Sequence, residues 1–214
     1  MIRYIMLFVF ILVIPYVSKK ENFMSLIGDD LDDNIILLDN FEKPNPDWEY
    51  GYGTWKIRTD ESNKILSHIS TETFGVALLK TKVYEDIYVK VRFRPIKGSE
   101  DQSGGIIFRA TDKDNYYLVR ANALENNFRF YKIVEGKRQQ LKSVEVTMPA
   151  KNQWHNLRVI VRGDQVQAFL DDKQLLEAKD TTFTSGFIGL WTKADSETDF
   201  DDFSIKLKSH VKSK

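Results

Sequence analysis

The stretch that decides the fold is SGGIIFRATDKDNYYLVRANALENNFRFYKIVEGK, from Ser103 to Lys137, and the run WHNLRVIVRGDQVQAFLDDKQLLEA, from Trp154 to Ala178, repeats its character. Apolar, aromatic and β-branched residues alternate with polar ones at a period of two, and Asp, Asn and Gly fill the gaps. This alternation is typical of antiparallel strands with one buried face and one wet face. The sequence therefore predicts an all-β fold, and no segment has the pattern of a cofactor-binding βαβ unit.

Strand-like runs extend outward from this stretch, from Ile35 to Leu207. The pairs Gly163-Asp164 and Asp171-Asp172 fall where tight hairpin turns are needed. We expect roughly a dozen strands, which is too many for one flat sheet and predicts two packed antiparallel sheets.

Composition excludes several classes of function. The 214 residues carry 31 Lys and Arg against 31 Asp and Glu, so the formal net charge is zero and nucleic acid is not an expected partner. The chain contains no cysteine, which excludes disulfides, thiolate metal sites and cysteine nucleophiles.

The N-terminus predicts export. Arg3 precedes an unbroken apolar run from Tyr4 to Ile14, and Ser18 is followed by two lysines. One positive charge before a short apolar helix is typical of an export signal, shorter than the ~20 residues that span a bilayer. We expect residues 1–18 to be a signal peptide, giving a secreted or periplasmic protein, or an uncleaved anchor, which would then be the only contact with a membrane. Translation from Met24 is the alternative.

The remaining chain divides by composition. Residues 19–34 are polar and acidic and are interpreted as a linker, residues 35–208 as one β-sandwich, and residues 209–214 as a basic tail.

Four segments carry a resemblance to a known family: LLDNFEKPNPDWEYGYGTWKI, SGGIIFRATDKDNYYLVRA, WHNLRVIVRGDQVQAFLDDKQLLEA and SGFIGLWTKADSETDFDDFSI. Together they resemble the concanavalin A-like jelly-roll superfamily, and within it laminin-G-like modules and the 3-keto-disaccharide hydrolase-like domain. The resemblance covers about Ile35 to Leu207 and implies a two-sheet jelly-roll sandwich. It leaves activity open, because this fold carries lectins, binding modules, glycosidases and adhesion domains.

An enzymatic reading rests on one acidic segment. Jelly-roll glucanases place their carboxylates as Glu-x-Asp-x-x-Glu, and Glu197-Thr198-Asp199-Phe200-Asp201-Asp202 resembles that spacing with a shorter last residue. The resemblance makes Glu197, Asp199 and Asp202 the alternative catalytic residues. The hydrolase-like domains often carry a Glu on the strand that here runs from Asn115 to Arg120, and this chain has no carboxylate there.

A calcium site is the second hypothesis for the same segment. If the first and last strands pair, Asp39 could join Asp199, Asp201 and Asp202, and hard oxygen ligands of this kind suit Ca²⁺. Ordinary loop aspartates that face water are the alternative.

A carbohydrate platform is the third hypothesis. Arginines recur on successive strands at Arg92 or Arg94, Arg109, Arg120, Arg129 and Arg158. Arginine forks and aromatic faces on a concave sheet suit sugar hydroxyls, and suit sugar carboxylates still better. We expect Arg109, Arg120, Tyr117 and Trp191 to bind the ligand. Tyr117 and Arg120 have opposite parity within one strand, so one of them must face the core, and Tyr117 is the easier to bury.

These observations favour an exported, non-catalytic, carbohydrate-binding jelly roll. The first alternative is a glycoside or 3-keto-disaccharide hydrolase of the same fold. The second is a structural or adhesion module at the cell surface with no small ligand.

Overall fold

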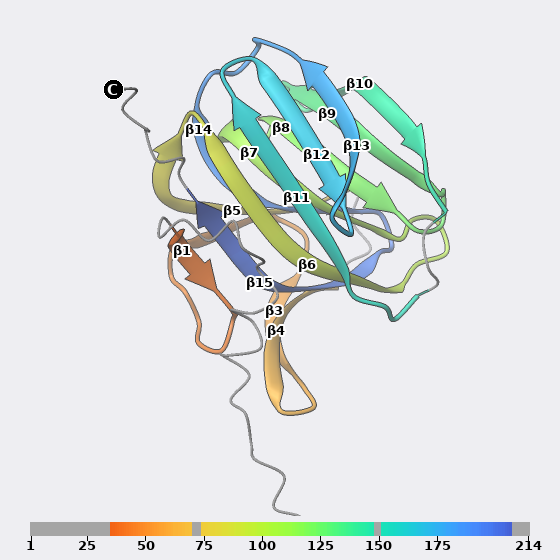
Figure 1. The fold of residues 1–214 in the computed structure, drawn as a ribbon. Helices are drawn as coiled ribbons and strands as arrows, with labels where there is room; N and C mark the ends of the chain where they lie inside the picture. Colours follow the sequence, from red (N-terminus) through yellow and green to blue (C-terminus); the bar gives the residue numbers. More distant parts are fainter. Residues whose placement is uncertain (1–34, 70–73, 148–150, 207–214) are drawn as a thin grey trace, which may run out of the picture. The chain divides into compact units, whose positions relative to one another are not determined.

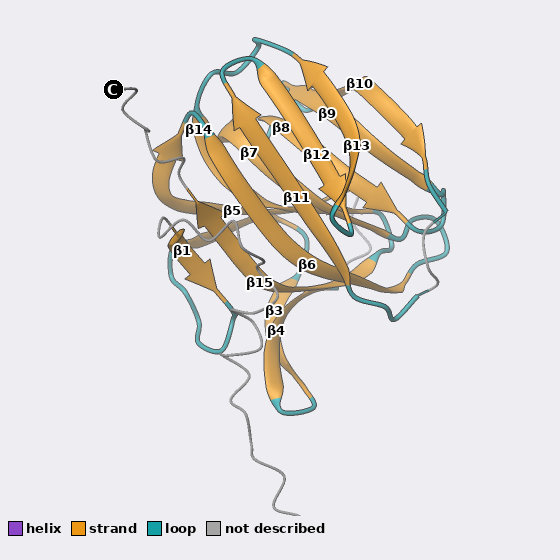
Figure 2. Ribbon diagram, in the orientation of Figure 1, coloured by secondary structure: helices purple, strands orange, loops and turns teal. Residues whose placement is uncertain are grey.

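The structure, a computed structural model, describes residues 35–69, 74–147 and 151–206. All regular secondary structure in these ranges is β-strand, which confirms the predicted all-β class (Figures 1 and 2). The leader helix, the linker and the basic tail expected from the sequence lie outside the described residues. The first strands are β1 (Ile35–Asp39), β2 (Trp48–Tyr52), β3 (Trp55–Asp60), β4 (Asn63–His68), β5 (Phe74–Tyr84), β6 (Ile87–Lys97) and β7 (Ser103–Asp112). The later strands are β8 (Asn115–Asn122), β9 (Asn127–Val134), β10 (Lys137–Glu145), β11 (His155–Arg162), β12 (Gln165–Leu170), β13 (Lys173–Lys179), β14 (Gly186–Lys193) and β15 (Glu197–Lys206).

The strands form two antiparallel sheets, here called sheet A and sheet B. Sheet A has eight strands in the order β13-β12-β11-β6-β15-β4-β3, with β1 pairing along the far half of β15. Sheet B has seven strands in the order β10-β9-β8-β7-β14-β5-β2. In Figure 1, β6, β11, β12 and β13 lie in front of β7, β8 and β9, so the two sheets form a jelly-roll sandwich.

The main hydrophobic core lies between the sheets. Sheet A contributes alternate residues of β6 to this core, namely Val89, Val91 and Phe93, and sheet B contributes Ile106 and Phe108 of β7. All five are fully buried. Full burial of each such side chain contributes about 1.5–3 kcal/mol to stability. The alternation therefore decides which face of each sheet packs against the other sheet.

A second apolar cluster lies on the face of sheet B that points away from sheet A, here called the outer face of sheet B. It includes Val76, Leu78, Ile107, Leu118 and Trp191. The two neighbouring residues Leu190 and Trp191 therefore belong to different clusters, as the period of two predicts.

The tight turns lie where the sequence predicted them. Asp171 and Asp172 both have positive φ, at 47° and 64°, between β12 and β13, and Gly163 has a φ of 55° between β11 and β12. Two consecutive positive φ values are the hallmark of the type I′ turn, whose twist matches the strands that it joins. Among the described residues there is no helix with the length and hydrophobicity that crossing a membrane would require.

Candidate functional site

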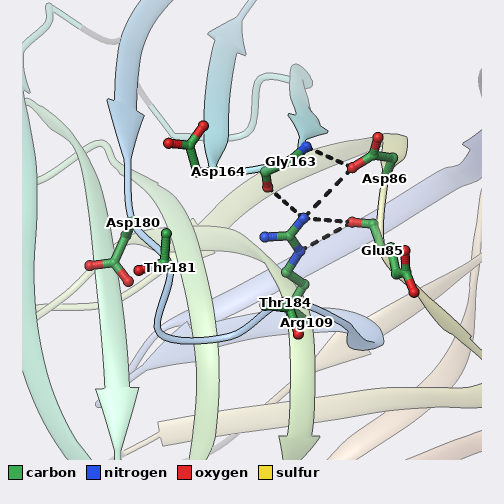
Figure 3. Close-up of a pocket in the computed structure, with 8 residues that line it drawn as sticks. All are labelled: Glu85, Asp86, Arg109, Gly163, Asp164, Asp180, Thr181 and Thr184. Carbon is green, nitrogen blue, oxygen red and sulfur yellow. Dashed lines mark hydrogen bonds and ion pairs between the residues drawn. The ribbon is translucent and has the colours of Figure 1, made fainter.

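A pocket of about 280 Å³ opens at one end of the sandwich and is here called the end pocket (Figure 3). Eight residues line it: Glu85, Asp86, Arg109, Gly163, Asp164, Asp180, Thr181 and Thr184. They come from three connections and one strand, namely the β5–β6 turn, the β11–β12 turn, the β13–β14 connection and β7. Segments distant in the sequence therefore meet at this point.

Arg109 forms the base of the end pocket. Its φ is 50° and it lies within an irregularity of the β7–β8 pairing between Phe108 and Asp112, so its side chain leaves the regular alternation. Arg109 as a whole is only 3% exposed. It donates hydrogen bonds to the carbonyl of Glu85 from Nε (3.1 Å) and Nη2 (3.0 Å), and to the carbonyl of Gly163 from Nη2 at 2.7 Å.

A further bond completes this brace. Nη1 of Arg109 donates to the carbonyl of Phe183 at 3.0 Å, so one side chain joins all three connections around the pocket. Nη1 carries two N–H groups and uses one of them on Phe183. In Figure 3 it is the guanidinium nitrogen on the side of Thr181 and Asp180.

The rim is also braced from loop to loop. The amide of Gly163 donates to Oδ1 of Asp86 at 2.8 Å, and the amide of Asp180 donates to the carbonyl of Asp164 at 3.2 Å. These contacts fix the rim before any ligand enters, which reduces the entropy that binding would cost.

Asp180 is held in its ionised form. It accepts hydrogen bonds from the Tyr117 hydroxyl, from the Thr182 amide at 2.8 Å and from Nζ of Lys132 at 3.0 Å. Burial alone would raise the pKa of Asp180, but hydrogen bonds from Thr182, Tyr117 and Lys132 outweigh it and hold that pKa well below its ordinary range. Burial and the neighbouring Asp180 carboxylate raise the pKa of Tyr117 to about 12.

The end pocket is rich in negative charge. Four of its eight lining residues are carboxylates, against the single cation Arg109. Lys132 compensates Asp180 at 3.0 Å, and Lys179 lies 3.6 Å from Asp164. Glu85 makes no salt bridge among the described residues, and Asp86 lies 3.7 Å from Arg109. The wall therefore offers mainly hydrogen-bond acceptors.

The four residues predicted to bind a ligand do not share one surface. Arg109 lines the end pocket, and Tyr117 lies in the core directly beneath it, bonded to Asp180. Arg120 and Trp191 lie on the outer face of sheet B. The expected common platform is wrong, because the bulge at Arg109 redirects that side chain toward the loops. Tyr117 does face the core between the sheets, as expected, but Arg120 on the opposite face is just as buried.

Arg120 and Trp191 belong to one row across sheet B. The pairing register aligns Trp191 with Gly105 of β7, Gly105 with Arg120 of β8, and Arg120 with Arg129 of β9. Each of Arg120 and Trp191 is 1% exposed. Arg120 donates to Asn127 at 2.8 Å and to Glu125 at 2.9 Å, and its Nε has no hydrogen-bond partner. Such burial leaves little surface for a glycan, so their part in ligand binding stays a prediction.

The other arginines of the predicted row are divided between the sheets. Arg92 and Arg94 of β6 and Arg158 of β11 belong to sheet A, while Arg120 and Arg129 belong to sheet B. Arg92 and Arg94 each lie over the ring of Trp154, at 4.7 Å and 4.6 Å from its centroid. The arginines therefore form several networks and no single cluster.

The alternative catalytic residues are engaged in ion pairs of sheet A. Asp199, whose side chain is 1% exposed, accepts bonds from Arg58 at 2.7 Å, from Arg94 at 2.8 Å and from Ser67. Glu197 pairs with Lys97 at 3.0 Å, and Asp202 pairs with Nε of Arg92 at 3.0 Å. All three carboxylates are engaged in ion pairs and none of them lines the end pocket, so the catalytic reading of this segment stays an untested prediction.

The expected calcium ligands are not brought together. Strand β1 does pair with β15, but the residue opposite Asp39 is Phe203, and Asp39 accepts bonds from Trp48 and Asn45, both at 2.9 Å. Asp201 is held by Asn63 at 2.8 Å and by Arg92.

Strand parity explains the separation, because Asp39 points to the Trp48 side of the sheet while Asp199 and Asp201 point to the arginines. Within the three described ranges, no group of His, Cys, Asp or Glu side chains is placed to hold a metal ion. These residues do not fit a calcium site, and calcium binding by the protein stays an untested prediction.

The two-sheet topology defines this chain as a concanavalin A-like jelly roll. The chain belongs to the 3-keto-alpha-glucoside-1,2-lyase-like domain family, whose model matches residues 34–206.

Individual relatives include both enzymes and a binding module. Levanase of Bacillus subtilis strain 168 is 28% identical over 153 residues, which cover 67% of this chain and 20% of levanase. The chain therefore spans about a fifth of that relative's length.

Two solved structures share the fold. The carbohydrate-binding module CBM66 of Bacillus subtilis aligns with a TM-score of 0.67 at 22% identity, covering 75% of this chain and 96% of the module. The β-glucanase of Bacillus licheniformis aligns with a TM-score of 0.55 at 13% identity, covering 80% of this chain and 97% of the enzyme.

Of the eight residues that line the end pocket, only Arg109 was predicted from the sequence to bind a ligand. Glu85, Asp86, Asp164 and Asp180 lie at strand ends, where acidic residues are ordinary turn formers. The sequence does show acidic residues in three of the turns that join strands of alternating pattern. Their meeting at one end of the sandwich depends on the topology of the sheets.

Proposed function

We propose that this protein is a non-catalytic carbohydrate-binding domain whose ligand enters the end pocket. The observation that carries the proposal is a braced pocket that combines exposed acceptors with a buried arginine at its base. Its volume of about 280 Å³ is close to the lower end of small-ligand sites, which begin at about 300 Å³. That size suits a small part of a glycan.

The chemistry of the wall suits a polyol. A sugar presents several hydroxyl groups, each able to donate one hydrogen bond and accept others. Carboxylates at Glu85, Asp86 and Asp164 would accept from such hydroxyls, and charge-assisted bonds of this kind are stronger than neutral ones. The spare N–H of Arg109 would donate, and Thr181 and Thr184 can do either.

Binding without cleavage is supported by the pKa of Asp180, one of the carboxylates of the pocket. A glycosidase needs one carboxyl group that stays protonated until it protonates the leaving group, and such a group has a raised pKa. In the end pocket the pKa of Asp180 is shifted in the opposite direction. The similarity to a carbohydrate-binding module supports the same reading, although enzymes share the fold.

A glycan array probed with the full chain tests this function. We expect binding to at least one polysaccharide. The array includes levan and β-glucan because two of the similar proteins are named levanase and β-glucanase. Every bound glycan is then incubated with the protein and assayed for new reducing ends. Release of product would contradict a non-catalytic role, and no bound glycan would contradict the proposal as a whole.

A further inference from the structure

We infer that the end pocket discriminates by charge, accepting uncharged sugars and rejecting those that carry carboxylate or sulfate groups. This inference rests on the proposed function and names the class of ligand for the same site. It reverses the expectation from the sequence, in which exposed arginine forks would favour sugar carboxylates.

The hydrogen-bond donors of Arg109 are almost all occupied by backbone carbonyls. An arginine recognises a carboxylate through two parallel N–H groups that point the same way. Arg109 uses Nε and Nη2 on the Glu85 carbonyl, and Nη2 also on the Gly163 carbonyl. Nη1 uses one N–H on Phe183. The remaining N–H can serve a single hydroxyl or ether oxygen, but it cannot form a fork.

The residues around that N–H donor are mainly acidic. Glu85, Asp86, Asp164 and Asp180 all line the pocket, and Arg109 is the single cation among its eight lining residues. Lys132 is engaged with Asp180, and Lys179 lies beside Asp164 on the exposed side. An anionic sugar would place like charges at close range in a partly enclosed site, where screening by water is weaker than at an open surface.

Most of the acceptors in the end pocket are exposed to solvent. Glu85, Asp86, Thr181 and Thr184 are exposed, and Asp164 is half-buried. A ligand therefore meets the carboxylates directly. Hydroxyl groups satisfy such acceptors, whereas a carboxylate or sulfate brings only further acceptors to them.

The test compares a β-glucan with its C6-carboxylated derivative, alongside an array that holds other neutral, carboxylated and sulfated glycans. For the full chain we expect every bound glycan to be uncharged, and each carboxylated derivative to bind at least tenfold more weakly than its neutral parent. Raising the salt concentration should narrow that difference, because the repulsion is screened.

A double variant assigns the effect to the pocket. Glu85→Gln with Asp164→Asn removes two lining charges and keeps the shapes of the side chains, so we expect the preference for the neutral parent to fall at least threefold. Glu49→Gln with Asp172→Asn makes the same change of net charge on exposed residues outside the pocket. This control should keep the wild-type preference.

The outcomes separate the inference from the proposed function. Binding of carboxylated or sulfated glycans as tightly as neutral ones would overturn the inference and leave carbohydrate binding standing. A preference that the Glu85 and Asp164 double variant leaves unchanged would also overturn it. Absence of binding to every glycan would overturn the proposed function, and the inference with it.

Discussion

Arg109 places a buried positive charge beneath three loops, and four backbone-directed bonds hold it there. Burial lowers the pKa of this guanidinium, while Asp86, Tyr117 and Glu85 act in the opposite direction. Because its donors satisfy carbonyls of Glu85, Phe183 and Gly163, removing the side chain would leave buried acceptors without partners. Arg109 therefore braces the loops, whereas the sequence predicted a ligand-binding residue on the face of a sheet.

We expect Arg109→Met to lower the free energy of unfolding by roughly 3 kcal/mol, because a buried charged donor to several carbonyls is lost. Urea unfolding of the full chain measures this. Arg129→Met is the matched control, since Arg129 is 30% exposed and pairs with Glu125 at the surface. Such a pair contributes about 0–1 kcal/mol. Equal losses in the two variants would contradict the bracing role of Arg109.

Asp201 is a second residue whose environment has a measurable consequence. Burial, followed by the charge of Asp202, raises the pKa of Asp201 to about 6, although Arg92 and Asn63 partly oppose this. In the unfolded chain an aspartate titrates near pH 4. Between these two values the folded state keeps a proton that the unfolded state has released. This contribution to stability is therefore present below about pH 4 and is lost as the pH rises through about 6.

Asp201→Asn should remove that loss. Relative to wild type, its free energy of unfolding should rise between pH 4 and pH 6 by on the order of 2 kcal/mol. Denaturant unfolding at a series of pH values gives the difference.

Asp195→Asn is a control of opposite sign. Hydrogen bonds from the Ser99 side chain and from the amides of Ser99, Glu100 and Asp101 lower the pKa of Asp195. The cost of the Asp195→Asn change should therefore shrink as the pH falls. A wild-type curve parallel to that of Asp201→Asn would refute the assignment of the raised pKa.

The sequence gives reliable information about which side of a strand a residue faces when the strand is regular. Parity separates Tyr117 from Arg120 and Leu190 from Trp191, and the structure agrees on both. It fails for Arg109, because an irregularity between Phe108 and Asp112 changes the direction of the side chain. A bulge of this kind has no residue signature in the run FRATD, so the pattern alone could not reveal it.

At the scale of elements, the contact between β14 and β5 depends on Gly189. A Cβ added there would lie 2.2 Å from the carbonyl oxygen of Ala77 and 2.9 Å from a methyl group of Leu78. Since the first of these atoms belongs to the backbone of the paired strand, it cannot move away without breaking the pairing of Leu78 with Gly189. A glycine at position 189 is therefore required for β14 to pair with β5 in sheet B.

Gly189→Ala should destabilise the protein by more than about 3 kcal/mol or prevent folding, as severe overpacking does. Gly163→Ala is the comparison, because its φ of +55° is strained for alanine while no atom lies within 4 Å of the added Cβ. Its cost should be about 1–2 kcal/mol. Thermal unfolding followed by circular dichroism ranks the two variants. Similar melting temperatures would show that the close approach at Gly189 is not limiting.

The elements themselves were largely predictable, and their assembly was not. Period-two alternation and Asp-Asp or Gly-Asp turns predict β11, β12 and β13 and their hairpins. The same pattern does not reveal that β4 belongs to sheet A while the next strand, β5, belongs to sheet B. That crossing depends on which faces pack together. The β5–β6 turn lies beside the β11–β12 turn at the end pocket because β6 pairs with β11, with Ile87 opposite Val161.

For the whole molecule, the N-terminal segment predicts export, and we propose that the protein acts outside the cytoplasm. Residues 1–34 fused to a reporter that is active only after export should give activity, because the apolar run after Arg3 has the pattern of an export signal. A fusion that begins at Met24 should give none. Equal activity of the two fusions would rule out the leader as the cause.

The proposed function requires a glycan to occupy the end pocket, and filling that pocket is the most direct test of it. Thr181→Trp places a large side chain at an exposed position of the rim, and Thr59→Trp adds the same residue at an exposed position of β3 in sheet A. Both full-length variants are titrated calorimetrically with the best glycan from the array, and their melting temperatures are recorded.

We predict one glycan site in each chain, wild-type affinity for Thr59→Trp, and at least tenfold weaker binding for Thr181→Trp, a loss of about 1.4 kcal/mol or more. Wild-type affinity in a folded Thr181→Trp variant would contradict glycan binding in the end pocket, because the ligand would then bind elsewhere on the protein.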